Sequence, residues 1–252
     1  MQSFKIICTD LDRTLLHESY SDGTTIPCGS KCSVARRVIV QLHALRARGV
    51  MIVLATGRRL NTAREALRII PHDFALLEHG GIILNRNGNA DQDWAKMLMP
   101  WVGMPNERCG PLWDYARMLS SEGFEVDMDD RFTSFGVAGT QERMGMLLSR
   151  THPEGLREVK NLKRVDILPT ASGKLNALSS LAGMLAIPIA NVAGLGDDYN
   201  DVEFLAGVGY PCTLPNAETL VVELVRARIG FVATKESHEG VTEILAHLAS
   251  SI

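Results

Sequence analysis

Two carboxylates near the start of the chain, Asp10 and Asp12, have a spacing that suits chemistry. They follow the apolar run from Phe4 to Thr9 and precede the hydroxyl of Thr14. Residues two apart in a strand point to the same side, so both carboxylates are expected to lean toward one site at a strand end. Two carboxylates this close repel each other unless a cation lies between them. The pair therefore predicts a metal site with a carboxylate that can act as a nucleophile or carry a proton.

Three further segments carry side chains that fit the same site. Thr56-Gly57-Arg58 follows a buried apolar run and offers a hydroxyl and a backbone N–H suited to a phosphate oxygen. Lys174 opens a predicted helix, where its ammonium adds to the positive potential of the helix N-terminus. A second acidic cluster reads Gly196-Asp197-Asp198-Tyr199-Asn200-Asp201. Each segment falls where a predicted strand or helix meets a loop.

These segments favour phosphoryl transfer. Open parallel sheets bind ligands beyond the carboxyl ends of their strands, so the four segments are expected to converge there. Carboxylate oxygens without nearby His or Cys ligands suit Mg²⁺ better than Zn²⁺. A phosphate dianion among the aspartates would be repelled without that ion, Lys174 and the Thr56 hydroxyl. The pattern predicts a carboxylate nucleophile and an aspartyl-phosphate intermediate, with charge neutralised by the metal and Lys174.

The elements that position these residues alternate between strand and helix at both ends of the chain. The apolar stripe of Val34, Val38, Leu42 and Leu45 predicts a helix from about Lys31 that stops at Gly49. The other elements expected in these two parts are strands at 4–9, 50–55, 74–78, 191–195, 208–213 and 231–233, and helices at 61–70, 174–186, 198–205, 217–226 and from 238.

The middle of the chain has a different composition. Polar, turn-rich stretches at 85–91 and 169–173 enclose expected helices at 111–121 and 140–151 and strands at 124–128, 132–138 and 165–168. This mixture suits a small α+β insertion. The expected fold class is therefore α/β, a Rossmann-like parallel sheet core (residues 1–86 and 169–252) with an inserted α+β domain (87–168).

Composition excludes several classes of function. The net charge of −3 over 252 residues gives no electrostatic case for nucleic acid or an anionic membrane. The five cysteines form no CxxC pair and are expected to be thiols in a reducing compartment. The start of the chain resembles no secretory leader, and no apolar stretch approaches the roughly 18 residues of a membrane span. The expected location is cytoplasmic.

Taken together, the motifs resemble a known family. Asp10-x-Asp12-x-Thr14, Thr56-Gly57-Arg58, Lys174 and Gly196-Asp197-x-x-Asn200-Asp201 are similar, in order and spacing, to the four motifs of the haloacid dehalogenase superfamily of phosphatases. The insertion resembles that of the Cof-like branch, whose type IIB α/β cap closes over the site. Residues 165–174 are similar to the corresponding segment of sucrose-phosphate phosphatases.

The resemblance implies a role for each motif residue. Asp10 matches the nucleophile and a Mg²⁺ ligand, and Asp12 matches the general acid/base, whose backbone carbonyl would also ligate the metal. The substrate phosphate would be bound by Thr56, Gly57, Lys174 and Asn200. Asp197 matches the remaining protein ligand of Mg²⁺, with Asp201 either beside the ion or behind its ligands.

The implied function is a Mg²⁺-dependent phosphatase of a small phosphorylated metabolite. The branch favours a sugar phosphate or phosphoglycoside, of the sucrose-phosphate or mannosyl-3-phosphoglycerate type. Two alternatives stay open: a phosphomutase of a sugar phosphate and a non-catalytic sensor of a phosphorylated ligand. The expected partner is the small-molecule substrate, without nucleic acid or membrane, and the chain is expected to be a monomer or a homodimer.

Five positions leave a choice open or depart from the family pattern. Arg13 and Leu175 stand where the family often has glycine. Arg58 is expected to touch phosphate or to pair with a neighbouring acid. His79, near the expected cap hinge, suits a structural role better than a catalytic one. Asp198 suits a helix N-cap better than a metal ligand.

Overall fold

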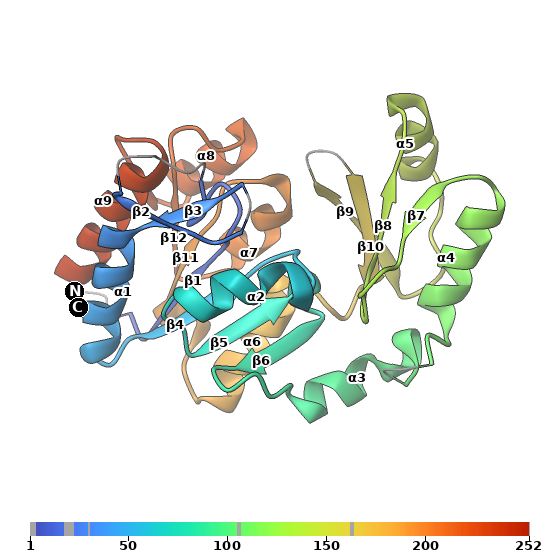
Figure 1. Ribbon diagram of the computed structural model, residues 1–252, viewed down its shortest axis with the longest axis horizontal. Helices are drawn as coiled ribbons and strands as arrows, with labels where there is room; N and C mark the ends of the chain where they lie inside the picture. Colours follow the sequence, from blue (N-terminus) through green and yellow to red (C-terminus); the bar gives the residue numbers. More distant parts are fainter. Residues whose placement is uncertain (1–3, 18–22, 30, 105–106, 162–163, 252) are drawn as a thin grey trace.

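The described residues form three β-sheets, of which a large one and a small one organise the fold and the third is a two-stranded ribbon (Figure 1). The computed structural model describes residues 4–17, 23–29, 31–104, 107–161 and 164–251. In spatial order, the large sheet contains β13 (Phe231–Val232), β12 (Tyr210–Thr213), β11 (Val192–Leu195), β1 (Ile6–Thr9), β4 (Met51–Ala55), β5 (Phe74–Leu77) and β6 (Ile82–Asn85). Neighbouring strands are parallel except β5 and β6, which are antiparallel. The α/β class predicted from the sequence is confirmed.

Helices cover both faces of this sheet, because its central strands are apolar on both sides. Ile6 and Cys8 of β1 pack in one hydrophobic cluster and Ile7 packs in the other, as alternation along a strand requires. On one face lie α1 (Arg36–Ala47), α2 (Leu60–Ile69) and α9 (Ser237–Ser250), and on the other α6 (Lys174–Met184), α7 (Val202–Gly207) and α8 (Thr219–Ala227). In the part of the chain that the structure describes, no helix is long and apolar enough to cross a membrane.

The small sheet is antiparallel and lies beside the large one (Figure 1). Its strands, in spatial order, are β7 (Glu125–Asp127), β8 (Phe135–Ala138), β10 (Arg164–Pro169) and β9 (Leu156–Asn161). The accompanying helices are α3 (Gln92–Val102), α4 (Pro111–Ser121) and α5 (Gln141–Leu148). We call this part the cap. Its limits at residues 87 and 168 stay a prediction, and they fall beside the ends of β6 and β10.

Three short 3-10 turns lie between the strands and helices of the large-sheet part. The segments η1 (Glu78–Gly80) and η3 (Tyr199–Asp201) are single turns of 3-10 helix, as is η2 (Ile189–Asn191) before β11. The segment η1 lies between β5 and β6, where the chain reverses direction within the large sheet, and the chain enters the cap after β6.

One predicted helix boundary is wrong. The helix expected from Lys31 begins at Arg36, and Val34 lies in β3 (Ser33–Ala35), which pairs with β2 (Thr25–Pro27). A tight turn brings these strands together: the Cys28 N–H donates to the Cys32 carbonyl at 2.8 Å. Gly29 in this turn has φ 129°, which glycine adopts without strain.

Two cap elements have no counterpart in the prediction. Helix α3 contains Pro100, which argues against a helix in sequence, yet the Asp91 carboxylate caps its start by accepting from the Trp94 N–H at 2.8 Å. Strand β9 carries Arg157, Glu158 and Lys160 and lies at the edge of its sheet, where charged side chains are common.

Candidate active site

The four predicted segments meet at the carboxyl edge of the large sheet. Asp10 follows β1, Thr56 follows β4 and Asp197 comes shortly after β11, and these three strands are neighbours. Lys174 is the first residue of α6, and its side chain reaches the same place from the opposite side. The convergence expected from the sheet topology is therefore present.

Lys174 is the hub of the site. Its buried Nζ donates to Oδ1 of Asp10 at 2.6 Å, Oδ1 of Asp201 at 2.6 Å and Oδ1 of Asn200 at 2.9 Å. Burial by itself lowers the pKa of Lys174, but the two carboxylates outweigh burial and raise the pKa above its usual value. The ammonium therefore stays charged and fixes three of the predicted residues relative to one another.

The carboxylates carry more negative charge than Lys174 alone offsets. Burial, together with Asp201 and Asp197, raises the pKa of Asp10 well above its usual value despite the attraction of Lys174. Burial and Asp201 likewise raise the pKa of Asp197 to about 7, although the Thr14 hydroxyl donates to its Oδ1 at 2.6 Å. The site thus lacks positive charge.

A divalent cation bound by these carboxylates would supply the positive charge that the site lacks. Asp10, Asp197 and Asp201 each offer one carboxylate oxygen, and these atoms lie within 4.8 Å of one another. Oδ2 of Asp197 is buried without a hydrogen-bond partner, so it is available as a ligand. The all-oxygen donor set suits Mg²⁺. The side chain of Asp12 does not belong to this group.

Asp198 and Asp201 also hold the loop after β11 in shape. Asp198 accepts from the Tyr199 N–H at 2.7 Å and caps η3, in agreement with the expected capping role. Oδ2 of Asp201 accepts from the N–H groups of Asp197 at 3.0 Å and Asp198 at 3.2 Å. Because Oδ1 of Asp201 also accepts from Lys174, this carboxylate orders the loop whether or not it touches a metal.

Asp12 is held by Arg58. Nε of Arg58 donates to Oδ2 of Asp12 at 2.8 Å, and Nη2 of Arg58 donates to Oδ1. The choice left open for Arg58 is thereby decided for this structure: the guanidinium pairs with an acid. The Asp12 side chain is 55% exposed, so it borders the cavity described below.

The Thr56-Gly57-Arg58 loop is fixed from behind by His79. The His79 N–H donates to the Thr56 carbonyl at 3.0 Å, and the His79 ring lies so close to Gly57 that an added Cβ would be 2.4 Å from its Cε1. Gly57 is therefore required by packing. The structural role expected of His79 fits this packing.

A cavity of about 220 Å³ opens in front of these residues. Its lining combines predicted and unpredicted residues, namely Asp10, Asp12, Arg13, Thr56, Gly57, Arg58, Arg59, Thr62, Arg131, Arg164, Asp198 and Asn200. Arg131 and Arg164 belong to the cap and were not identified from sequence. No motif marks them, because they come from the loop before β8 and the start of β10.

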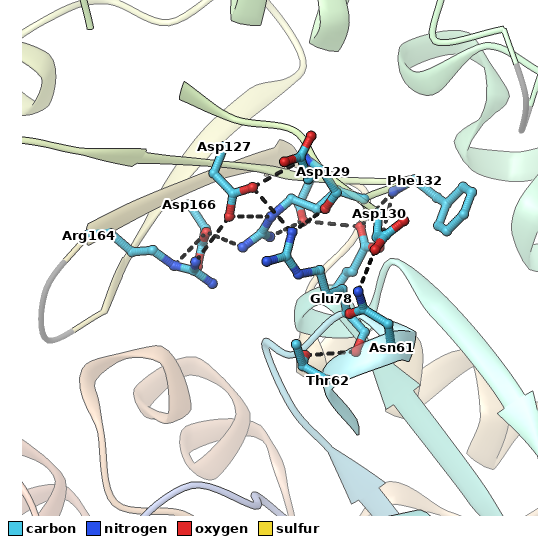
Figure 2. Close-up of polar contacts among 12 residues, drawn as sticks. Asn61, Thr62, Glu78, Asp127, Asp129, Asp130, Phe132, Arg164 and Asp166 are labelled. Carbon is cyan, nitrogen blue, oxygen red and sulfur yellow. Dashed lines mark hydrogen bonds and ion pairs between the residues drawn. The ribbon is translucent and has the colours of Figure 1, made fainter. Parts of the chain in front are cut away.

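A buried polar network joins η1, which contains Glu78 and His79, to the cap. Both Glu78 carboxylate oxygens accept from the Phe132 N–H, and Oδ2 of Asp166 lies 2.9 Å from Nε2 of His79. Glu78 also accepts from the Thr133 N–H at 2.8 Å and from the Ser134 hydroxyl at 3.1 Å. Figure 2 shows Glu78 below the cap residues Asp127, Asp166 and Arg164. The network ties the loop behind Gly57 to the cap.

The two departures from the family pattern have structural counterparts. Arg13 has φ 61°, a left-handed conformation that glycine adopts more easily, and its Nε lies 3.4 Å from Oδ2 of Asp197. Leu175 lies against Gly207, where an added Cβ would be 2.4 Å from Cδ1 of the leucine. Neither residue displaces Asp10 or Lys174.

The fold and the site define a hydrolase of the haloacid dehalogenase type, and comparison with known proteins agrees. The family model of haloacid dehalogenase-like hydrolases matches residues 7–98 and 150–245. The chain belongs to this family, and it is a phosphatase.

Individual relatives are distant but match over nearly the whole chain. A 5-amino-6-(5-phospho-D-ribitylamino)uracil phosphatase of Escherichia coli is 22% identical, over 96% of this chain and 95% of the relative. A phosphoglycolate phosphatase of Methanosarcina acetivorans is 23% identical over 98% of both chains. Among solved structures, the sucrose-phosphatase of Synechocystis aligns with a TM-score of 0.71 and 20% identity, over 99% of both chains.

Proposed function

We propose that this phosphatase is Mg²⁺-dependent and hydrolyses a sugar phosphate or phosphoglycoside through an aspartyl-phosphate on Asp10. The observation that carries the proposal is the contact of Lys174 with Asp10, Asn200 and Asp201 at the edge of the parallel sheet. A similar fold in a sucrose-phosphatase supports the substrate class. We further propose a cytoplasmic monomer or homodimer.

Asp10 is the proposed nucleophile. One of its carboxylate oxygens forms the bond to phosphorus while the bond from phosphorus to the ester oxygen of the substrate breaks. Lys174 lies 2.6 Å from Oδ1 of Asp10, so its ammonium offsets charge on the phosphoryl oxygens beside the nucleophile. Thr56, the N–H of Gly57 and Asn200 are proposed to hold the other phosphoryl oxygens.

Asp12 is the proposed proton carrier. It gives a proton to the leaving oxygen and then takes one from the water that attacks the aspartyl-phosphate, which releases inorganic phosphate. In the structure its carboxylate is bound by Arg58, so the contact between these two side chains must open during the reaction.

Asp10, Asp197 and Asp201, with the backbone carbonyl of Asp12, are the residues proposed to hold Mg²⁺. When bound, the ion would offset the charge of the carboxylates and of the incoming phosphate dianion. Thr14 orients Asp197 by donating to its Oδ1, and Oδ2, which has no hydrogen-bond partner, is the oxygen proposed to bind the metal.

The test is phosphate release from a panel of sugar phosphates, phosphoglycosides, phosphoglycolate and nucleotides, with p-nitrophenyl phosphate as a general substrate. Activity is expected to vanish with EDTA and to return with Mg²⁺. Asp10→Asn is expected to abolish turnover while far-UV circular dichroism and the unfolding midpoint stay close to those of the parent. An active Asp10→Asn variant would overturn the assignment of the nucleophile.

The same panel separates the alternatives. A phosphomutase would yield an isomerised sugar phosphate instead of inorganic phosphate. A non-catalytic sensor would bind a phosphorylated ligand and release nothing from any member of the panel.

A further inference from the structure

The cavity in front of Asp10 is lined by several arginines that the proposed mechanism does not use. Five arginines and three aspartates line it, and the lysine that contacts Asp10 is not among the lining residues. Three of these arginines have contacts that leave them open to a further ligand. They are Arg58 of the large-sheet domain and Arg131 and Arg164 of the cap.

Arg131 has hydrogen-bonding capacity that the protein does not use. Its side chain is 1% exposed and its Nη1 donates to the Ser134 hydroxyl at 3.0 Å, yet its buried Nε has no hydrogen-bond partner. The carboxylate oxygen that lies near Nε, Oδ2 of Asp127, is 3.6 Å away. Buried donors are seldom left without an acceptor, so this one points to a ligand.

Like Arg131, Arg164 has only long contacts with the carboxylates beside it. Its Nε lies 3.2 Å from Oδ1 of Asp166 and its Nη1 lies 3.6 Å from Oδ2 of Asp127. Oδ1 of Asp166 is 3.3 Å from Nη2 of Arg131 but takes part in no hydrogen bond. Figure 2 shows Arg164, Asp127 and Asp166 gathered above Asn61 and Thr62 of α2. Two guanidinium groups thus share acidic neighbours that neither engages fully.

Arg58 loses its acidic partner during the reaction. Its guanidinium donates to both oxygens of Asp12, and Asp12 must turn to the leaving oxygen to deliver a proton. The Arg58 side chain is largely shielded from water, so a guanidinium left unpaired there is unfavourable. An anion supplied by the substrate would replace the lost carboxylate.

From these contacts, and on the basis of the proposed function, we propose that the substrate carries a second anionic group. This group, a carboxylate or a second phosphate on the leaving part of the molecule, is bound by Arg58, Arg131 and Arg164. The planar guanidinium fork matches both kinds of anion in bidentate geometry. Binding this group draws Arg58 away from Asp12 and releases the proton carrier, so the second anion contributes to turnover as well as to affinity.

Matched pairs of substrates test the proposal. Phosphoglycolate against 2-hydroxyethyl phosphate, and glucuronic acid 1-phosphate against glucose 1-phosphate, differ in a carboxylate that replaces a hydroxymethyl group. Glucose 1,6-bisphosphate against glucose 6-phosphate differs in a second phosphate, and this arm separates the two sources of charge. The acidic member of at least one pair is expected to have a kcat/KM higher by roughly tenfold or more, since hydrogen bonds to charged groups are strong.

Two variants connect the preference to the arginines. Arg164→Gln is expected to remove most of this advantage and to leave kcat/KM for the neutral substrate within about twofold. Arg131→Gln should act in the same direction, and Arg164→Gln is decisive if the buried variant fails to fold. Arg117→Gln is the control, because Arg117 pairs with Asp114 on the exposed face of α4. Its ratio between paired substrates should equal that of the parent.

The outcomes distinguish the two proposals. If every substrate pair is hydrolysed at equal kcat/KM, or if Arg164→Gln keeps the preference, the second-anion proposal fails while the phosphatase stands. If no substrate, including p-nitrophenyl phosphate, releases phosphate, the proposed function itself fails.

Discussion

The ring of His79 packs directly against the α-carbon of Gly57, with room for a hydrogen atom and nothing larger. This contact explains why the loop that follows β4 contains glycine, although Gly57 does not have a positive φ. The backbone on both sides is tied as well, since the His79 N–H donates to the Thr56 carbonyl and the Glu78 N–H to the Arg58 carbonyl, each at 3.0 Å.

Gly57→Ala is expected to destabilise the protein and to lower its activity together. A Cβ 2.4 Å from Cε1 of His79 forces the loop or the ring to move, at a cost of about 1–3 kcal/mol. Urea unfolding and phosphate release measure the two effects. Gly183→Ala in α6 is the control: no atom lies within 4 Å of its added Cβ, and it should be neutral or slightly stabilising. Parent-like stability and activity of Gly57→Ala would contradict the packing argument.

Lys174→Met should cost stability as well as catalysis. Replacement leaves the buried carboxylates of Asp10 and Asp201 without their shared cation, a change worth about 3–5 kcal/mol for a buried pair. Turnover is expected to fall by at least about a hundredfold. The matched control is Lys96→Met, which breaks only an exposed pair with Asp93. Retained activity in Lys174→Met would remove this lysine from the proposed mechanism.

The stability of the metal-free protein should fall as pH rises through about 7. The pKa of Asp197 is raised from a usual value near 3.8 to about 7 in the folded protein, mainly by burial. Between these two values the folded state binds more protons than the unfolded state, so the free energy of unfolding decreases with increasing pH. The decrease is complete once pH exceeds the folded pKa. Asp10, whose pKa is also raised, acts in the same direction.

Thermal unfolding in EDTA between pH 5 and pH 8.5 measures this effect. Mg²⁺ favours the ionised carboxylates, so the rise in Tm that it causes should be larger at pH 8 than at pH 5. Asp197→Asn should flatten the pH dependence and weaken the response to Mg²⁺. An unfolding midpoint that rises steadily with pH in EDTA would show that Asp197 does not titrate in this way.

Glu78→Gln should loosen the attachment of the cap. The Glu78 carboxylate accepts from the N–H groups of Phe132 and Thr133 and from hydroxyls of Thr133 and Ser134, and an amide has one acceptor oxygen in place of two. The expected loss of stability is about 1–3 kcal/mol. Faster hydrogen exchange at residues 132–134 would locate the change. Glu122→Gln, which affects an ion pair with Arg150 on the cap surface, should leave exchange there unaltered.

Sequence reasoning was most successful where a short motif stands at a strand end. Asp10, Thr56 and Asp197 had predictable positions, because parallel topology sends the carboxyl ends of β1, β4 and β11 to one edge. Lys174 was predictable because it begins a helix that faces this edge. Their convergence is confirmed, while the chemical roles of these residues remain predictions.

Residues that depend on how the cap meets the large sheet were not predictable. Arg131 and Arg164 have no local signal, since only the docked cap places them beside Arg58. No motif in the sequence marks Glu78. The groups that donate hydrogen bonds to its carboxylate belong to a loop more than 50 residues further along the chain. The helix boundary near Lys31 was wrong because Val34 continued the apolar spacing of a helix that starts later.

The contact between Leu175 and Gly207 suggests how this chain tolerates its departure after the lysine. The leucine side chain occupies the space where residue 207 would place its own Cβ. A large side chain on α6 is thus accommodated by the missing side chain on α7, so the two positions form a compensating pair. We therefore expect exchange at both sites, Leu175→Gly with Gly207→Ala, to be better tolerated than Gly207→Ala alone, and related chains to vary at these two positions together.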